Sequence, residues 1–344
     1  IACQAADVAA EHYHLNDFYQ AFLHTGKHVM GGVDSLAGAQ QMYDLACCIA
    51  GDAQRLRQKP FVSVVTNPIS PLTLDIQTLK ILEFCVLRGI PITCAPAPIS
   101  GVTAPATLAG TLAQLHAEAL FGVALVQFLS AGAPVMYGAV ASTMDLRTMD
   151  LAMGSVEAAM INTGAVALAH YYNLPIYATA GVTDSKLPDI QAGFEKGVSY
   201  LLLGMAGADY IHLAAGMLDS GNSIAYEQYV IDNEILGMIE RILRGITVDR
   251  HTLGLDCIKD VGPGGNYVLE DHTVTHMFNE FFYPRLAVRE QYDRWTDLGE
   301  PTPKTKAQEL VKQCLDAPEP RLDPQAVARV RQRFPEIVDI EPNN

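Results

Sequence analysis

Short apolar runs alternate with longer helix-like segments along most of the chain. A loop rich in Gly, Pro or Ser follows each run, and an amphipathic or apolar stretch follows the loop. Strands that alternate with helices in this way are typical of parallel strands joined by right-handed crossovers. The predicted strands lie at about 28–30, 61–65, 92–95, 134–137, 174–177 and 209–213, and the predicted helices at 35–58, 71–88, 105–130, 154–172, 189–206 and 225–244.

This α/β pattern fits either a closed barrel or an open doubly wound sheet. The spacing between runs stays near about 30–40 residues, and no G-x-G-x-x-G motif follows the first run, which favours the barrel. We therefore predict a TIM-type (β/α)8 barrel. Only six of its eight strands are visible, and the sequence starts in helix-like residues at Ile1 without an initiator Met. We expect that an N-terminal part of the barrel is missing from this chain.

The character of the sequence changes after residue 245. Gly262-Pro-Gly-Gly-Asn266 opens a loop, and a helix that carries His272 and His276 follows it. The last residues are charged and rich in Pro. The predicted division is a catalytic barrel domain over 1–296 and a Pro-rich helical tail over 297–344, with helix-like pieces at 306–315 and 325–334.

Composition and charge exclude several classes of protein. The chain is 49% hydrophobic and 18% charged, as expected when both faces of a sheet are covered. A formal net charge of -15 argues against a nucleic-acid or anionic-membrane partner and favours a cationic or neutral small molecule. Seven cysteines without metal-type spacing indicate a reducing cytoplasm.

Two uncharged stretches are long enough to cross a membrane, at 119–144 and 158–183. Ser130-Ala-Gly-Ala-Pro134 interrupts the first, and Asn173-Leu-Pro175 interrupts the second. Such interruptions are typical of a helix that ends before a strand, so we predict no membrane span.

Reactive groups in parallel α/β folds gather where the strands end, since the loops converge there. Tyr137 and Tyr177 lie on predicted strands, whereas Asp145 and Asp184 lie in the loops that follow. A quaternary ammonium forms no conventional hydrogen bond, so aromatic faces and carboxylates must recognise it. The sequence predicts an acidic, Tyr-bearing mouth, although each residue alone also fits turn chemistry or core packing.

Three other features suggest different chemistry. Lys186 could form a Schiff base as in a barrel aldolase, but the neighbouring Asp184 favours a solvated, charged lysine. His272 and His276 have the spacing of two metal ligands on a helix, but no Glu directly follows His272, and we predict no metal. The glycine-rich turn at 262–265 lacks the Lys-Ser/Thr ending of a phosphate-binding loop.

Four stretches form a combination that is more specific than any one of them. They are Asn67-Pro-Ile-Ser-Pro71, Asp184-Ser-Lys-Leu-Pro-Asp189 with Gln191 and Glu195-Lys196, Ile231-Asp-Asn-Glu234, and Gly262-Pro-Gly-Gly-Asn266 with His272-Thr-Val-Thr-His276. Together they resemble the trimethylamine methyltransferase family of amine:corrinoid-protein methyltransferases, over about residues 15–295. The resemblance implies a cytoplasmic, methanogenesis-related enzyme with a TIM-type barrel. A partner corrinoid protein would dock over its mouth and carry the corrinoid (cobalamin) cofactor.

The trimethylamine enzymes of this family carry pyrrolysine in the barrel, whereas this chain has no nonstandard residue. The resemblance therefore points to the non-pyrrolysine branch, which resembles glycine betaine methyltransferase. A quaternary amine leaves as a neutral tertiary amine when Co(I) attacks its methyl group, so neither a general acid nor a bound metal is required. Trimethylamine or another methylamine is the alternative substrate. A lyase that uses Lys186 and a non-catalytic binding subunit are the alternative functions.

Strand-end position and the matched motifs supply the candidate site residues. We predict Asp184 as the catalytic residue, close to the ammonium head of the substrate. The predicted substrate-binding residues are Tyr137, Tyr177, Asp145, Arg147, Lys186, His212, His272 and His276, and the predicted corrinoid-facing residues are Asn67, Gly181, Gly264, Gly265 and Asn266.

Overall fold

A parallel sheet of six strands forms the centre of the protein in the computed structural model, which describes residues 8–315 and 321–338. The strands lie side by side in chain order, and every neighbouring pair is parallel. They are β1 (Val29–Gly32), β2 (Val62–Thr66), β3 (Ile92–Cys94), β5 (Val135–Ala139), β8 (Ile176–Thr179) and β9 (Tyr210–His212). All six predicted strands are confirmed.

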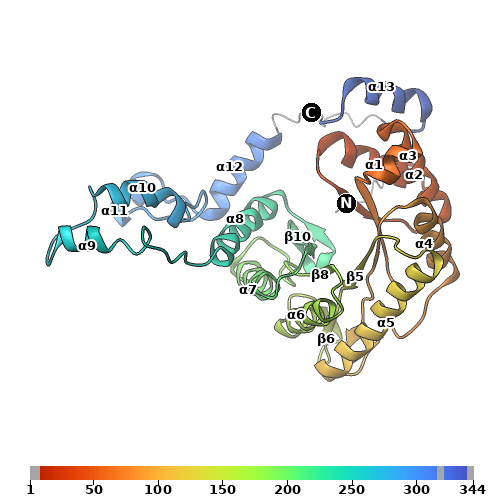
Figure 1. Ribbon diagram of the computed structural model, residues 1–344, viewed down its shortest axis with the longest axis horizontal. Coiled ribbons are helices and arrows are strands. Elements are labelled where there is room, and N and C mark those ends of the chain that lie inside the picture. The colour runs from red at the N-terminus through yellow and green to blue at the C-terminus, as the bar shows by residue number, and fades with distance from the viewer. Residues whose placement is uncertain (1–7, 316–320, 339–344) are drawn as a thin grey trace.

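The order of the strands distinguishes the two fold classes that the sequence allowed. A doubly wound sheet reverses its strand order at a switch point, whereas this sheet never reverses and curls into a half-barrel (Figure 1). The α/β architecture is therefore confirmed, in a form compatible with a TIM-type barrel. Within the described residues β1 and β9 are the two edges of the sheet and are not paired with each other, so the curl is open between them.

A helical segment follows each strand and covers the outside of the curl (Figure 1). Side chains of Ser35, Asp75, Thr107, Ser155 and Asp189 accept hydrogen bonds from backbone N–H groups in the first turn of a helix, which explains where five of these helices begin. The helices are α2 (Leu36–Ala50), α3 (Ala53–Gln58), α4 (Ile76–Arg88), α5 (Leu108–Leu129), α6 (Val156–Tyr171), α7 (Ile190–Ala206) and α8 (Tyr226–Leu243).

The predicted helix over 35–58 differs from the structure, because the segment forms two helices, α2 and α3. Gly51 has a φ of 101°, which ends α2, and Asp52 then begins α3 by accepting a hydrogen bond from the Arg55 N–H. The hydrophobic pattern continues from α2 into α3, so the pattern alone could not reveal the break between the two helices.

Helix α5 is, within the described ranges, the one helix long and apolar enough to cross a membrane by length and composition. Leu115, Ala119 and Val126 on its inner side are fully buried in the core, whereas Phe128 is exposed.

Side chains alternate between the two faces of the curled sheet, as the two-residue period of a strand requires. Val64, Tyr137 and Ile176 point outward into the core between sheet and helices, where burial of apolar surface stabilises the fold. Met30 and Tyr177 point inward and belong, with Ala95 and Val140, to a separate buried cluster. The inner face therefore forms the wall of any site inside the half-barrel.

Two small sheets of short strands lie in the loops at the carboxyl ends of the main strands. One small sheet joins β4 (Ile99–Ser100), β6 (Ser142–Asp145) and β7 (Asp150–Ala152), and a hairpin joins β10 (Met217–Leu218) to β11 (Ser223–Ile224). Segments of two to four residues carry too little pattern to be predicted from the sequence.

Residues 245–302, which we call the arm, project away from the sheet (Figure 1). The arm contains α9 (Leu255–Val261), α10 (Asp271–Glu280) and α11 (Tyr292–Asp297). Beyond it, α12 (Pro303–Leu315) packs on α8, and α13 (Pro324–Arg333) packs on α2, next to α1 (Tyr13–His24). Residues 316–320 and 339–344 of the predicted tail lie outside the described residues.

Candidate functional site

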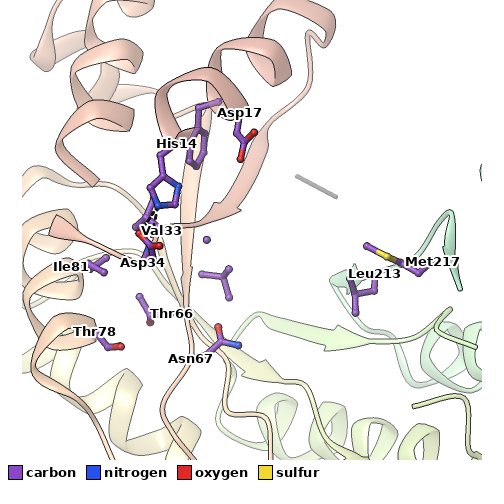
Figure 2. Close-up of a pocket in the computed structure, with 13 residues that line it drawn as sticks. His14, Asp17, Val33, Asp34, Thr66, Asn67, Thr78, Ile81, Leu213 and Met217 are labelled. Atoms are coloured by element: carbon purple, nitrogen blue, oxygen red, sulfur yellow. Dashed lines mark hydrogen bonds and ion pairs between the residues drawn. The ribbon is translucent and has the colours of Figure 1, made fainter. Parts of the chain in front are cut away.

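Two adjoining cavities lie between the edges of the curled sheet, and we call them together the mouth cavity. The larger measures about 640 Å³ and lies between α1, the ends of β1 and β2, and the loop after β9 (Figure 2). The smaller measures about 320 Å³ and lies against the inner face of the sheet. They share Gly32, Val65, Leu213 and Met217, and their volumes suit a small-molecule ligand.

An acidic wall of the mouth cavity is formed by Asp17 on α1 and Asp34 after β1. Figure 2 shows the His14 ring pointing toward Asp34, and its Nε2 lies 2.7 Å from the Asp34 Oδ1. Hydrogen bonds from Tyr13 and His14 hold the pKa of Asp34 below its ordinary value, so this carboxylate is ionised at neutral pH.

Neither aspartate of this acidic wall was among the predicted site residues. Asp34 lies in the short loop after β1, and this position was a usable signal because the ends of parallel strands carry the site. His14 and Asp17 lie before that strand, and no pattern in the sequence linked them to the cavity.

An aromatic wall faces the smaller cavity from β8 and β9. The Tyr177 ring stacks on Tyr210 with centroids 5.3 Å apart and on His212 with centroids 4.7 Å apart. Tyr210 is 40% exposed, whereas Tyr177 is buried. Burial raises the pKa of the Tyr177 hydroxyl well above its ordinary value and lowers the pKa of His212 to about 4, so both rings are uncharged at neutral pH.

The pKa of His212 predicts an acid-sensitive stability. Between about pH 6.5 and pH 4 the unfolded chain binds a proton at His212 that the folded chain lacks, so stability falls as the pH drops through this window. We expect the free energy of unfolding to drop by about 2–3 kcal/mol more in the wild type than in His212→Gln. Urea unfolding of both proteins at pH 7 and pH 4 measures the difference. Equal drops would show that His212 is not shielded from water.

Tyr137 lies on the opposite face of the sheet from Tyr177. It is fully buried against the outer helices, and its hydroxyl lies 3.1 Å from the His116 Nδ1 on α5. The structure therefore does not bring Tyr137 together with the other aromatic residues predicted to bind substrate. In the sheet, Tyr137 is paired with Ile176 of β8, whose side chain also points outward, whereas the inward-facing Tyr177 is paired with Gly138.

Asp184 joins three loops at the carboxyl end of the sheet. Its Oδ1 accepts hydrogen bonds from the Gly154 N–H at 3.1 Å and the Ser220 hydroxyl at 2.6 Å. Lys186, in the same loop, donates to the Asp184 carbonyl at 2.7 Å and lies 3.2 Å from an Asp219 carboxylate oxygen. The Lys186 side chain is 71% exposed, so nothing desolvates it as a Schiff-base lysine requires.

Asp145 and Arg147 pair with each other on the turn between β6 and β7. The guanidinium makes two hydrogen bonds to the carboxylate, at 2.9 and 2.6 Å, and lowers the pKa of Asp145 to about 2. These residues line a separate cavity of about 410 Å³, outside the mouth cavity. Each charge is already satisfied by its neighbour.

The predicted corrinoid-facing residues lie in three places. Asn67 lines the larger cavity (Figure 2). Gly181 lies under the Tyr200 ring, where an added Cβ would come within 2.3 Å of a ring carbon. Gly264, Gly265 and Asn266 lie in the arm between α9 and α10, which Figure 1 shows away from the sheet.

The two arm histidines contact each other, with ring centroids 4.5 Å apart, and the His272 Nε2 lies 3.1 Å from the His251 carbonyl. The structure does not bring His272 and His276 together with the strand-end residues. Across the described parts of the chain, no group of three or more His, Cys, Asp or Glu side chains has the geometry of a metal site.

Comparison with known proteins gives a family match over nearly the whole chain. The family model described as "Trimethylamine methyltransferase (MTTB)" matches residues 1–334. Among curated proteins, trimethylamine methyltransferase MttB of Desulfitobacterium hafniense strain DCB-2 is 36% identical over 320 residues, which are 93% of this chain and 64% of that protein.

Two further relatives show the range of named substrates. Glycine betaine methyltransferase of D. hafniense strain Y51 is 31% identical over 329 residues, covering 94% of this chain and 68% of that protein. Trimethylamine methyltransferase MttB of Methanosarcina barkeri is 36% identical over 265 residues, covering 77% of this chain and 53% of that protein. The chain thus spans between about half and two thirds of the length of these relatives.

Proposed function

The chain belongs to the trimethylamine methyltransferase family, as its sequence motifs predicted, and on this premise we propose that it transfers a methyl group from a small quaternary amine to the Co(I) of a corrinoid held by a partner protein. One observation supports a quaternary amine as the substrate. The smaller part of the mouth cavity has an uncharged aromatic wall, the larger part has an ionised carboxylate, and the described lining residues include no Lys or Arg. Such a cavity favours a fixed positive charge.

The proposed reaction needs little acid–base chemistry from the protein. The methyl carbon forms a bond to cobalt while its bond to nitrogen breaks, and the bonding electron pair stays on nitrogen. The amine therefore leaves neutral and takes up no proton. The corrinoid supplies the nucleophile, and the task of this chain is to orient the C–N bond and exclude water, which contributes several kcal/mol to lowering the barrier.

We assign the ammonium head to Tyr177 and Tyr210, with Asp34 and Asp17 providing a negative field across the cavity. His212 is neutral and acts as a ring surface and hydrogen-bonding group rather than as a cation. Asp184 belongs to the site as the residue that holds three loops at the mouth, since its Oδ1 already accepts two hydrogen bonds.

The direct test is methylation of free cob(I)alamin by the purified protein. Glycine betaine, proline betaine, carnitine, choline and trimethylamine are offered in turn, and the visible spectrum of the corrinoid is followed. We expect at least one quaternary amine to react faster than trimethylamine. No reaction with any amine would favour a binding subunit, and a borohydride-trapped adduct at Lys186 would favour a lyase.

We expect Tyr210→Leu to raise KM for the quaternary amine about 2- to 30-fold, since one well-placed ring contributes about 0.5–2 kcal/mol to binding a cation. Tyr210→Phe keeps the ring and should retain wild-type KM. Tyr171→Leu, on the exposed outer side of α6, is the control for loss of a surface tyrosine. An unchanged KM in Tyr210→Leu would remove this ring from the substrate site.

A further inference from the structure

A buried ion pair joins α7 to α8 directly behind the mouth. The Lys196 Nζ lies 2.9 Å from the Asp232 Oδ2, and both side chains are 0% exposed. A buried ion pair is weak evidence for stability, because well-packed apolar side chains of similar volume often stabilise a core equally well or better. The contacts of this pair point to another role.

Both members of the pair bind the backbone of strand-end loops. Lys196 also donates to the carbonyl of Gly181, after β8, at 2.6 Å. The Asp232 Oδ2 also accepts from the N–H of Gly216, after β9, at 2.8 Å, and its Oδ1 accepts from the Gln228 side chain. One pair thus holds two adjacent loops.

The neighbouring residue, Glu195, holds the next part of the first loop. Its Oε2 accepts hydrogen bonds from the Thr183 hydroxyl at 2.5 Å and from the Asp184 N–H at 2.9 Å. Backbone bonds then tie this loop to the one after β9, from the Asp219 N–H to Ser185 and from the Ser220 N–H to Thr183, both at 2.8 Å.

The held backbone reaches the proposed substrate site. Residues 213–215 and Met217 line the smaller cavity beside the Tyr210 and His212 rings. A shift of the Gly216 backbone would therefore change the shape of the wall, and small misplacements of a reacting centre slow a reaction strongly.

We propose that Glu195, Lys196 and Asp232 are positioning residues that fix the loops at 181–185 and 214–217 so that the amine is held in line for methyl transfer. This inference rests on the proposed function. None of the three side chains needs to touch the substrate, because they act through backbone carbonyl and N–H groups.

The test is the double variant Lys196→Met/Asp232→Leu, which fills the buried space without the polar links to Gly181 and Gly216. Three quantities are measured: the thermal midpoint, amide hydrogen exchange at 181–185 and 214–217, and kcat and KM for methylation of free cob(I)alamin by the preferred amine. We expect a thermal midpoint above that of the single variant Lys196→Met, because no buried charge is left unpaired, together with faster exchange in both loops and a kcat at least about tenfold lower with a smaller change in KM.

Glu195→Gln is the milder second variant, since this side chain is partly exposed and its loss does not leave a buried charge. We expect faster exchange at 183–184 and a lower kcat. Arg241→Met, on the same helix as Asp232 but bound to the arm at Glu280, is the control and should leave loop exchange and kcat unchanged.

Loops that stay protected in both variants, or loops that loosen while kcat is retained, would overturn the inference. A wild-type protein inactive with every amine would instead overturn the proposed function. In that case the exchange measurement still decides whether the three side chains fix the loops.

Discussion

Lys196→Met alone is expected to lower the free energy of unfolding by about 3–5 kcal/mol, the usual cost of leaving one member of a buried ion pair without its partner. Asp232 is 0% exposed, so water cannot replace the lost ammonium group. Burial already raises the pKa of Asp232, and removal of Lys196 takes away the charge that opposes this effect. The Gly181 carbonyl loses its hydrogen-bond donor in the same step.

Urea unfolding measures this loss, and Lys186→Met is its matched control. Lys186 also pairs with an aspartate, Asp219, at a similar distance of 3.2 Å, but its side chain is 71% exposed. An exposed pair of this kind contributes about 0–1 kcal/mol. Similar losses in the two variants would mean that burial does not set the cost of breaking the Lys196 pair.

Gly138→Ala is the second large effect, and we expect it to lower the free energy of unfolding by about 3 kcal/mol, the upper end of the usual cost of overpacking. Gly138 lies in β5 opposite Tyr177 and beside the end of β3. An added Cβ would come within 2.4 Å of the Ala95 Cα and 2.5 Å of the Cys94 carbonyl oxygen. These atoms belong to the backbone, so no rotamer change relieves the overlap, and the strands must separate.

Gly197→Ala, in α7, is the control for adding the same methyl group. Its Cβ would meet no atom within 4 Å, and alanine in a helix is favoured over glycine by about 1 kcal/mol. We expect this variant to be as stable as the wild type or more so in urea unfolding. A Gly138→Ala protein of wild-type stability would show that β3 and β5 approach less closely than described.

The elements of the half-barrel could be predicted from the chain because each carries its own local signal. The apolar run at 61–65 became β2, and the predicted helix over 105–130 became α5 with Thr107 as its cap. The break at Gly51 could not be predicted, since a single glycine is tolerated inside many helices. The positive φ of Gly51 depends on how α2 and α3 pack in the folded protein.

The candidate site was predicted only in part. The loop after β8 was singled out through Asp184, because parallel strands bring their carboxyl ends together. Tyr137 and Tyr177 carried equal weight in the sequence, yet one residue of register decides which face a strand side chain occupies. The structure places Tyr177 inside the curl and Tyr137 among the outer helices.

The sequence by itself determined the order of strands and helices, the family and the acidic character of the chain, because these depend on residue type and on spacings of two to four residues. Only the tertiary structure decided which distant groups meet: His14 with Asp34, and Lys196 with Asp232 beneath two loops. It also placed His272 and His276 in the arm rather than beside β9. The physical reason is that these contacts depend on how the sheet curls and how the helices pack around it, and no local pattern records that geometry.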